Sequence, residues 1–359
     1  MWSNETFSPA PLQHPRSPHL NGNATFRHHD TAVLSVTAVD APVVKTSAEF
    51  DEIIGESYDR NALRPGMLAK LAGITERRWW REDQNFVDGA VEAARAALEQ
   101  AQVDPAKVGL LVNTSVSREH LEPSIAVSVH KNLDLPTSCL NFDITNACLG
   151  FVNAMQLAAT MIDAGQIDYA LIVCGEGSRT PQERTLARLS SPEATAEDIT
   201  SQFATLTLGS GAAAMLLGRA SEHPDGHRVV GGVTRAATQH HELCVGDFTE
   251  MRTDAQGLLV AGMGLAKELW ADAAKEFDWS DMDRYIVHQV SKVHTSRTAE
   301  ALGLDPSRIP LTFPTYGNVG PAAVAITLAK EVNSLTDGDR VLMMGIGSGL
   351  NMTCVEIDW

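Results

Sequence analysis

The sequence lacks the patterns that mark disulfide-bonded, metal-binding, membrane-spanning and nucleic-acid-binding proteins. It holds five scattered cysteines and no C-x-x-C pair, which argues against a disulfide framework and a zinc site. No apolar run reaches the roughly 18 residues that a membrane helix needs. Only 28 Lys and Arg residues accompany 45 Asp and Glu residues, for a formal net charge of −17. Because phosphate contacts need clustered basic side chains, neither nucleic acid nor an anionic membrane is expected as a main partner.

The first residues also lack the charged and then apolar pattern of a signal peptide, so we expect a cytoplasmic protein without stable membrane insertion. With 359 residues, 44% of them hydrophobic, the chain is long enough for two domains or one large α/β unit. Residues 1–29 are rich in Pro, Ser, Asn and His and show no helical or strand period. We expect them to form an N-terminal tail, either disordered or packed on the body.

Beyond the tail, short apolar runs alternate with helical stretches. The runs expected to form buried strands are 108–112, 169–173, 212–217, 285–287 and 341–344. The stretches with helical spacing are 88–101 and 151–164. Strands separated by helices of this length imply parallel βαβ units and an α/β fold.

The same order of segments occurs twice. A small-residue turn, a helix and a buried strand follow one another in NACLGFVNAMQLAATMIDAGQIDYALIVCGEGS and again in YGNVGPAAVAITLAKEVNSLTDGDRVLMMGIGSG. Both halves also contain a Gly-Ser-Gly strand entry, in LGSGAAAMLL and IGSGLNMTCVEI. We therefore expect an N-terminal half over residues 30–222 and a C-terminal half over residues 228–359. A polar stretch near 181–207 indicates a helical insertion, either over the site or on the surface.

Cys148 lies in the turn NACLG, after a strand-like run and at the start of a predicted helix. Free N–H groups and the positive end of the helix dipole are expected to stabilise its thiolate and lower its pKa. The small neighbours Ala147 and Gly150 leave room for a substrate beside the sulfur. Taken alone, such a cysteine fits a buried structural role better than a catalytic one.

Two further motifs change this interpretation. His288 follows a predicted strand in VHQVS, and Asn318 lies in the glycine-rich turn YGNVGPAA that leads into a helix. In a duplicated fold, Asn318 occupies the position in the second half that Cys148 occupies in the first. The duplication would bring these two turns together, with His288 arriving from a neighbouring strand end. The three residues therefore form one candidate site.

The motifs NACLGF, VHQVS and YGNVGPAA together resemble those of the thiolase superfamily, and most closely its ketoacyl-ACP synthase III branch. Within that branch, LLVNTSVSREHLEPS, FDITNACLGFVNAM, LTLGSGAAAM and IGSGLN are most similar to the olefin-pathway head-to-head condensing enzymes of the OleA type. The resemblance covers nearly everything after the tail. It implies a thiolase fold, in which duplicated βαβαβ halves form a five-layered α-β-α-β-α core.

By this resemblance, one acyl-CoA acylates Cys148. His288 and Asn318 then donate hydrogen bonds to the thioester oxygen of the second acyl group, where enolate charge develops. Backbone N–H groups of Cys148 and of the turn at Ser348 form the other oxyanion hole. Such fixed donors are each worth roughly 3 to 4 kcal/mol of barrier. CoA thioesters are thus expected as substrates, with no permanently bound cofactor and no metal.

Glu122, in LEPS, separates the competing reactions. A synthase III makes its carbanion by decarboxylating a malonyl group, and its pattern at this position is apolar. A non-decarboxylating Claisen condensation instead needs a carboxylate to remove the proton α to a thioester. The head-to-head enzymes carry a Glu at the matching position and supply it across a dimer interface. The resemblance therefore implies that Glu122 is the base of a condensation of two fatty acyl-CoAs to a 2-alkyl-3-ketoacyl product, which feeds olefin or β-lactone synthesis.

The segment GMLAKLAGITERRWW departs from the synthase III pattern, because apolar residues stand where those enzymes hold CoA with a Trp and an Arg. No phosphate contact is therefore assigned to the nearby Arg64, Lys70, Arg77 or Arg78. The tail is a second departure, since the bacterial condensing enzymes usually lack it. Three alternatives stay open: a decarboxylating synthase III, a hydroxymethylglutaryl-CoA synthase-like enzyme, and one subunit of a heterodimeric condensing enzyme in place of a homodimer.

Overall fold

The computed structural model describes residues 24–247 and 250–359. The described strands are β1 (Thr25–Arg27), β2 (Thr31–Asp40), β3 (Val43–Thr46), β4 (Glu76–Trp79), β5 (Val108–Asn113), β6 (Leu140–Asp143), β7 (Tyr169–Glu176), β8 (Gly211–Arg219), β9 (His227–Ala236), β10 (Cys244–Gly246), β11 (Met251–Thr253), β12 (Arg284–Val287), β13 (Arg340–Gly347) and β14 (Asn351–Asp358). The described α-helices are α1 (Ser47–Ile53), α2 (Gly55–Arg60), α3 (Phe86–Gln100), α4 (Ile125–Asn132), α5 (Gly150–Asp163), α6 (Arg179–Leu189), α7 (Ala196–Ser201), α8 (Phe203–Thr207), α9 (Ala255–Ala273), α10 (Lys292–Leu302), α11 (Phe313–Tyr316) and α12 (Ala322–Glu331). The five strands predicted from apolar runs and the two helices predicted from helical spacing are all confirmed.

Two sets of strands have the same order and the same directions. In the first set, β2 pairs antiparallel with β8, β8 antiparallel with β7, and β7 parallel with β5. In the second set, β9, β14, β13 and β12 pair in the same way. The first set alone continues to a further parallel strand, β6, at the edge. A short antiparallel pairing of β2 with β9 joins the two sets, and the repeat confirms the expected duplication.

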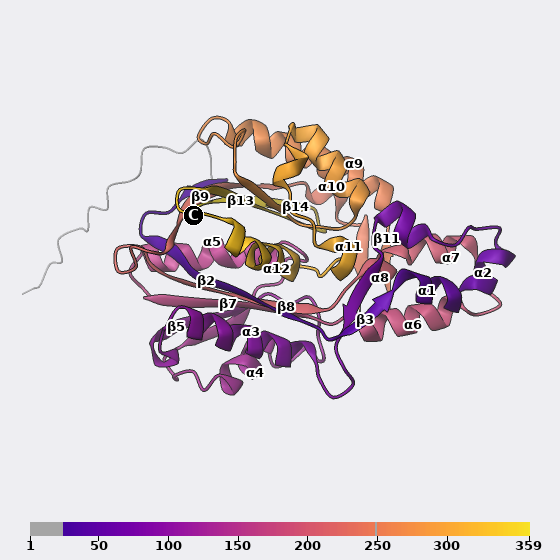
Figure 1. Ribbon diagram of the computed structural model, residues 1–359, viewed down its shortest axis with the longest axis horizontal. Helices are drawn as coiled ribbons and strands as arrows, with labels where there is room; N and C mark the ends of the chain where they lie inside the picture. The colour runs from indigo at the N-terminus through magenta and orange to yellow at the C-terminus, as the bar shows by residue number, and fades with distance from the viewer. Residues whose placement is uncertain (1–23, 248–249) are drawn as a thin grey trace, which may run out of the picture.

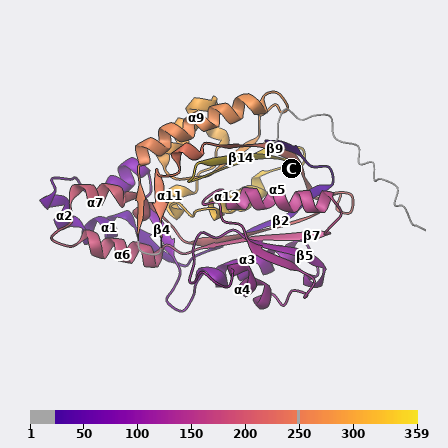
Figure 2. The same cartoon turned by 180° about the vertical axis from the view of Figure 1, so that it is seen from behind.

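Helices separate and cover the two sets of strands (Figure 1). α5 and α12 lie between the sets and contact strands of both. α3 and α4 cover the outer face of the first set, and α9 and α10 cover that of the second, as the view from behind also shows (Figure 2). The result is the expected five-layered α-β-α-β-α core. Within the part of the chain that the structure describes, no helix is long and apolar enough to cross a bilayer.

A side lobe extends from one end of the layers (Figure 1). Residues 181–207, expected to form a helical insertion, lie in α6, α7 and α8 and the turns between them. Their apolar side chains pack with those of α1 and α2 in one cluster, including Phe50, Tyr58 and Leu186. α8 also contacts β11 of the β10–β11 hairpin. The lobe is therefore built from two stretches of chain that are far apart in sequence.

The expected tail of residues 1–29 overlaps the fold. Residues 1–23 of it lie outside the described residues. Thr25–Arg27 form β1, which pairs antiparallel with β9. His28 is buried and its Nδ1 lies 3.1 Å from the carboxylate of Asp163 at the end of α5. Residues 25–28 of the expected tail therefore pack on the body, which is one of the two outcomes expected for it. Their short edge strand carries too few residues to show a period in the sequence.

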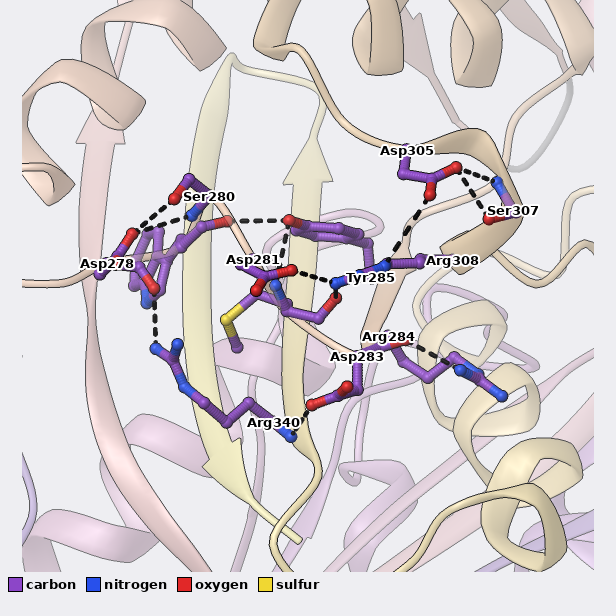
Figure 3. Close-up of polar contacts among 12 residues, drawn as sticks. Asp278, Ser280, Asp281, Asp283, Arg284, Tyr285, Asp305, Ser307, Arg308 and Arg340 are labelled. Atoms are coloured by element: carbon purple, nitrogen blue, oxygen red, sulfur yellow. Dashed lines mark hydrogen bonds and ion pairs between the residues drawn. The ribbon is translucent and has the colours of Figure 1, made fainter.

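A polar network fixes the amino end of β12, whose carboxyl end leads to His288 (Figure 3). The Tyr285 hydroxyl donates to the carbonyl oxygen of Trp279 at 2.9 Å. On the neighbouring strand β13, the backbone N–H of Arg340 donates to the Asp283 carboxylate at 2.8 Å. Both strands are thus held at the end opposite to the candidate site, so their other ends present a defined backbone.

Candidate active site

Cys148 lies in a sharp turn between β6 and α5. The preceding residue, Ala147, has a φ of 45°, a left-handed conformation that costs a non-glycine residue roughly 1 to 3 kcal/mol. The backbone N–H of Leu149 donates to the Asn146 carbonyl at 3.0 Å and closes the turn. α5 begins at Gly150, so the cysteine stands just ahead of a helix N-terminus, as predicted.

The turn at Ser348 packs against the Cys148 turn. A Cβ added to Gly347 would stand only 2.5 Å from the Asn146 carbonyl oxygen, an approach that glycine alone allows. The side-chain amide of Asn351 donates to Asn146 Oδ1 at 3.2 Å. The two turns expected to share an oxyanion hole are therefore in contact.

Asn318 lies in a turn that is fixed by backbone hydrogen bonds. Its N–H donates to the Thr207 carbonyl at 2.8 Å, and its own carbonyl accepts from Gly209 at 2.9 Å. Its side-chain Oδ1 accepts the N–H of Gly320 at 3.0 Å. Because the amide oxygen is engaged in this way, the amide nitrogen is the group left to donate to a substrate.

His288 follows β12, and its backbone N–H donates to the Met344 carbonyl of β13 at 2.8 Å. The residue is 8% exposed, and its Nδ1 is buried without a hydrogen-bond partner among the described residues. Burial lowers the pKa of His288 to about 4, and His294 acts in the same direction. The imidazole is therefore neutral at pH 7, with one donor and one acceptor nitrogen.

The acidity of Cys148 differs from the expectation. Burial raises the pKa of its thiol to about 12, and the charges of Glu176 and Cys244 act in the same direction. The expected lowering of the pKa was wrong, because the loss of water around the sulfur and a nearby carboxylate oppose the helix dipole. At pH 7 the Cys148 side chain is thus a thiol and the His288 side chain a neutral imidazole.

Glu176, at the end of β7, is a residue of this site that the sequence reasoning missed. It is 7% exposed and lies beside the Asn318 turn, where a Cβ added to Gly320 would stand 3.4 Å from its carboxyl carbon. Burial raises the pKa of Glu176, and hydrogen bonds from Ser117 and from the backbone oppose that rise. The available signal was a single carboxylate that ends the otherwise apolar strand YALIVCGE.

Glu122 lies in the loop between β5 and α4, residues 114–124, and is exposed. Three apolar side chains of the same region are exposed beside it in sequence: Val116 at 49%, Leu121 at 78% and Val127 at 43%. Among the described residues Glu122 forms no ion pair. Cys148, Asn318 and Ser348 thus lie half-buried in backbone turns, whereas the expected base is exposed.

The four basic residues near the substituted CoA motif differ in their surroundings. Arg77 is fully buried and donates to Ser47 Oγ at 3.0 Å and to the Leu206 carbonyl at 3.2 Å. Burial lowers the pKa of Arg77 to about 10. It holds the side lobe together, whereas Arg64 and Lys70 are exposed. Within the described ranges, no group of His, Cys, Asp and Glu side chains could hold a metal ion.

Comparisons with known proteins define the class. Residues 142–236 match the 3-oxoacyl-[acyl-carrier-protein] synthase III family, and residues 273–359 match the C-terminal domain of the same family. The chain therefore belongs to the synthase III family of thiolase-fold condensing enzymes.

Within that family, the chain is similar to the acyl-CoA:acyl-CoA alkyltransferase of Xanthomonas campestris, with 42% identity over 92% of this chain and 99% of the relative. The alkyltransferase of Shewanella oneidensis is 34% identical over 89% of this chain and 96% of the relative. The crystal structure of cerulenin-bound Xanthomonas campestris OleA superposes with a TM-score of 0.91, at 42% identity over 93% of this chain and 98% of that one. A Xanthomonas oryzae protein described as a 3-oxoacyl-(acyl carrier protein) synthase III also has a TM-score of 0.91 and 42% identity, over 93% and 100% of the two chains.

Proposed function

We propose that this protein condenses two fatty acyl-CoA molecules, without decarboxylation, to a 2-alkyl-3-ketoacyl product. The observation that carries the proposal is the joint presence of the Cys148, His288 and Asn318 set and of Glu122 in the loop after β5. Similarity to two acyl-CoA:acyl-CoA alkyltransferases supports it. A further support is that a cysteine-to-serine variant of Xanthomonas campestris OleA has been crystallised with lauric acid and lauroyl-CoA.

The spacing of the site residues supports their roles. In solved variants of Xanthomonas campestris OleA, a replaced glutamate precedes a replaced cysteine by 26 positions, and a replaced histidine follows that cysteine by 142. In this chain Glu122 precedes Cys148 by 26 positions, and His288 follows by 140. Equal or nearly equal separations at 42% identity favour equivalent roles for the three residues.

In the first half-reaction, the Cys148 sulfur attacks the carbonyl carbon of one acyl-CoA. The neutral imidazole of His288 is the group suited to take the thiol proton, and the proton finally leaves on the CoA thiol. Backbone N–H groups of Cys148 and Ser348 would hold the oxyanion between the two contacting turns.

In the second half-reaction, the Glu122 carboxylate removes an α-proton from the second acyl-CoA. His288 and the amide nitrogen of Asn318 donate to the enolate oxygen. The carbanion then attacks the acyl carbon on Cys148, the new carbon–carbon bond forms, and the cysteine leaves as a thiolate. The proton that Glu122 removed returns to this thiolate, which restores the thiol and the carboxylate. Preorganised donors of this kind act because they need no reorganisation when charge appears.

We also propose a dimer, formed with a second copy or with a homologous chain, in which Glu122 reaches the partner's site. Leu140, on the edge strand β6, is 50% exposed, and the loop of residues 114–124 and α4 add the exposed Val116, Leu121 and Val127. An exposed base beside an apolar edge supports delivery across an interface. The division into residues 30–222 and 228–359 is kept as a proposal, supported by the gap between the end of β8 and the start of β9.

The test is Glu122→Gln, with Glu119→Gln as the matched control in the same loop. Glu122→Gln should load an acyl group on Cys148 at the normal rate, measured by intact-protein mass. Condensation of two acyl-CoAs should fall by about 10² to 10⁴. Glu119, which accepts a hydrogen bond from Asn85, should tolerate the change in both steps.

A malonyl donor distinguishes the alternative, which the match to the Xanthomonas oryzae synthase III favours. Decarboxylation makes the carbanion without a base, so malonyl-CoA should bypass the Glu122→Gln defect wherever it is accepted. If Glu122→Gln condenses two acyl-CoAs at the wild-type rate, the role of Glu122 as the base is wrong. If the wild-type protein condenses an acyl group only with the malonyl donor, the proposed reaction is wrong and the decarboxylating synthase III replaces it.

A further inference from the structure

The loop of residues 114–124, which carries Glu122, is held at its start by the buried carboxylate of Glu176. The backbone N–H groups of Val116 and Ser117 donate to it at 2.6 and 3.1 Å, and the Ser117 hydroxyl donates at 2.6 Å. The same hydroxyl accepts the N–H of Gly177 at 2.9 Å. Three donors from two consecutive residues therefore fix the direction in which the loop leaves β5.

A second carboxylate holds the other end of the loop. Asp143, at the end of β6, accepts the backbone N–H groups of Ile125 and Ala126 at 3.0 and 2.9 Å, the first N–H groups of α4. It also pairs with Arg118 at 3.1 Å, and both side chains are largely buried. Because an acidic group at a helix N-terminus satisfies otherwise unpaired donors, Asp143 sets where α4 begins.

The two anchors are themselves connected beneath the loop. The Asn113 amide donates to Asp143 at 3.1 Å, and Asn113 Oδ1 accepts the hydroxyl of Ser115 at 2.7 Å. Ser115 in turn accepts the N–H of Gly175, the residue before Glu176, at 3.0 Å. Residues 116–118 and 125–126 are thus tied to one network, and only the short stretch with Glu122 lies between them.

The chemistry of Glu176 is unusual for a purely structural group. Burying a carboxylate is costly unless it is paired, and in the described part of the chain it has no cationic partner. Its compensation comes from loop N–H and hydroxyl donors, which are the groups that aim the loop. It also lies beside the Asn318 turn, so it links the loop to the site of its own chain.

We propose that Glu176 and Asp143 are positioning residues that set the Glu122 carboxylate for abstraction of the α-proton. The inference rests on the proposed function, in which Glu122 is the base. A base must stand within hydrogen-bond reach of the proton that it takes. Since a misplacement of about 1 Å costs on the order of 10²-fold in rate, a loop that carries a base needs anchors at both ends.

The experiment compares Glu176→Gln and Asp143→Asn with Glu356→Gln as the matched control. Each change keeps the side-chain shape but turns one acceptor oxygen into a donor that faces N–H or O–H groups. Condensation in the first two variants should fall on the order of 10²-fold, while loading of Cys148 is not slowed. Glu356 is 4% exposed and accepts from Trp279 and from Arg340, each at 2.7 Å. It lies on β14 and away from the loop, so its variant should keep both rates.

The decisive arm repeats Glu176→Gln in the Glu122→Gln background. If Glu176 acts through Glu122, the residual condensation of Glu122→Gln should change by no more than about twofold, because residues that act as a unit are non-additive. A further fall as large as in the wild-type background would overturn the inference, and so would equal losses of loading and condensation. Should Glu176→Gln fail to fold, Ser117→Ala, which removes one of the three donors, should show the same selective loss in smaller measure.

The outcomes separate this inference from the proposed function. If Glu122→Gln is impaired in condensation while Glu176→Gln and Asp143→Asn remain fully active, only the positioning role is overturned. A fully active Glu122→Gln overturns the role of Glu122 as the base, and the positioning role with it.

Discussion

The Cys148 thiol should react with iodoacetamide much more slowly at pH 7 than an ordinary cysteine. A pKa of about 12 for its thiol leaves about 10⁻⁵ of the sulfur as thiolate at pH 7, against about 10⁻² for an unperturbed side chain. His288 does not change this balance, because burial lowers its pKa to about 4 and the ring carries no charge at pH 7. The rate of alkylation therefore measures the protonation state of Cys148 in the absence of substrate.

The rate of alkylation should rise about tenfold per pH unit from pH 7 to pH 9.5 without a plateau, since the thiolate is the reactive form. Peptide mass after digestion identifies the modified residue, and Cys148→Ser supplies the blank. Glu176→Gln tests the direction in which this carboxylate shifts the pKa of Cys148. The carboxylate raises the pKa of Cys148, so its loss should lower that pKa and speed alkylation at a fixed pH.

A plateau reached below pH 7 would refute this reasoning. It would mean that Cys148 exists as a thiolate beside a protonated His288, and that the helix terminus outweighs burial. The resting enzyme would then be primed before substrate arrives, and the proton transfer assigned to His288 during loading would not be needed.

Three further predictions concern loading, stability and assembly. Cys148→Ser should abolish covalent acyl loading in intact-mass assays while leaving the fold unchanged, because the swap is nearly isosteric; loading that persists on the variant would contradict the assignment. Asp163→Asn should lower the free energy of unfolding at pH 7 by about 1 to 3 kcal/mol in urea titrations. Burial acts to raise the pKa of Asp163, but hydrogen bonds from His28, from backbone N–H groups and from Thr31 lower it to about 2. The wild type should therefore lose this contribution to stability as the pH falls from 4 towards 2, and the variant should not. Light scattering should show a dimer, and Leu140→Asp should weaken it and reduce condensation more than loading; an active monomer would refute delivery of Glu122 to a partner.

Buried regular elements could be predicted from the sequence, whereas exposed edges could not. Val108–Asn113 and Tyr169–Glu176 lie inside the sheets with nearly every side chain buried, so a plain apolar run marks them. Thr25–Arg27 is a three-residue edge strand, and Cys244–Gly246 belongs to a separate hairpin. Such segments gain their structure from one neighbouring strand, and their own residues carry no period.

The features of the candidate site also differed in whether they could be predicted from the sequence. The positions of Cys148 and Asn318 followed from turn motifs, because small residues before a helix constrain the backbone locally. The acidity of Cys148 did not follow, because it depends on burial and on Glu176, which is distant in sequence. Glu176 itself was missed because a single glutamate carries no motif, and its role depends on loop N–H groups that only the fold brings to it.

The duplication explains why one half of the chain cannot form the site by itself. Cys148 and Asn318 both follow a residue with positive φ, Ala147 at 45° and Gly317 at 69°, and both precede a central helix. Each turn packs against the Gly-Ser-Gly segment of the other half. A Cβ on Gly347 would stand 2.5 Å from an oxygen of the Cys148 turn, and one on Gly209 would stand 1.7 Å from the carbonyl oxygen before Gly317.

This exchange of contacts has a chemical consequence. The nucleophile's turn is supported by the second half, and the donor amide's turn is supported by the first, so the distance between sulfur and amide is set by packing between the halves. Among the described residues, the hydrogen bonds and the ion pair that hold the loop with Glu122 come from its own half. If Glu122 is the base, as proposed, its position depends on Glu176 and Asp143, and a single substitution at either buried carboxylate should alter it.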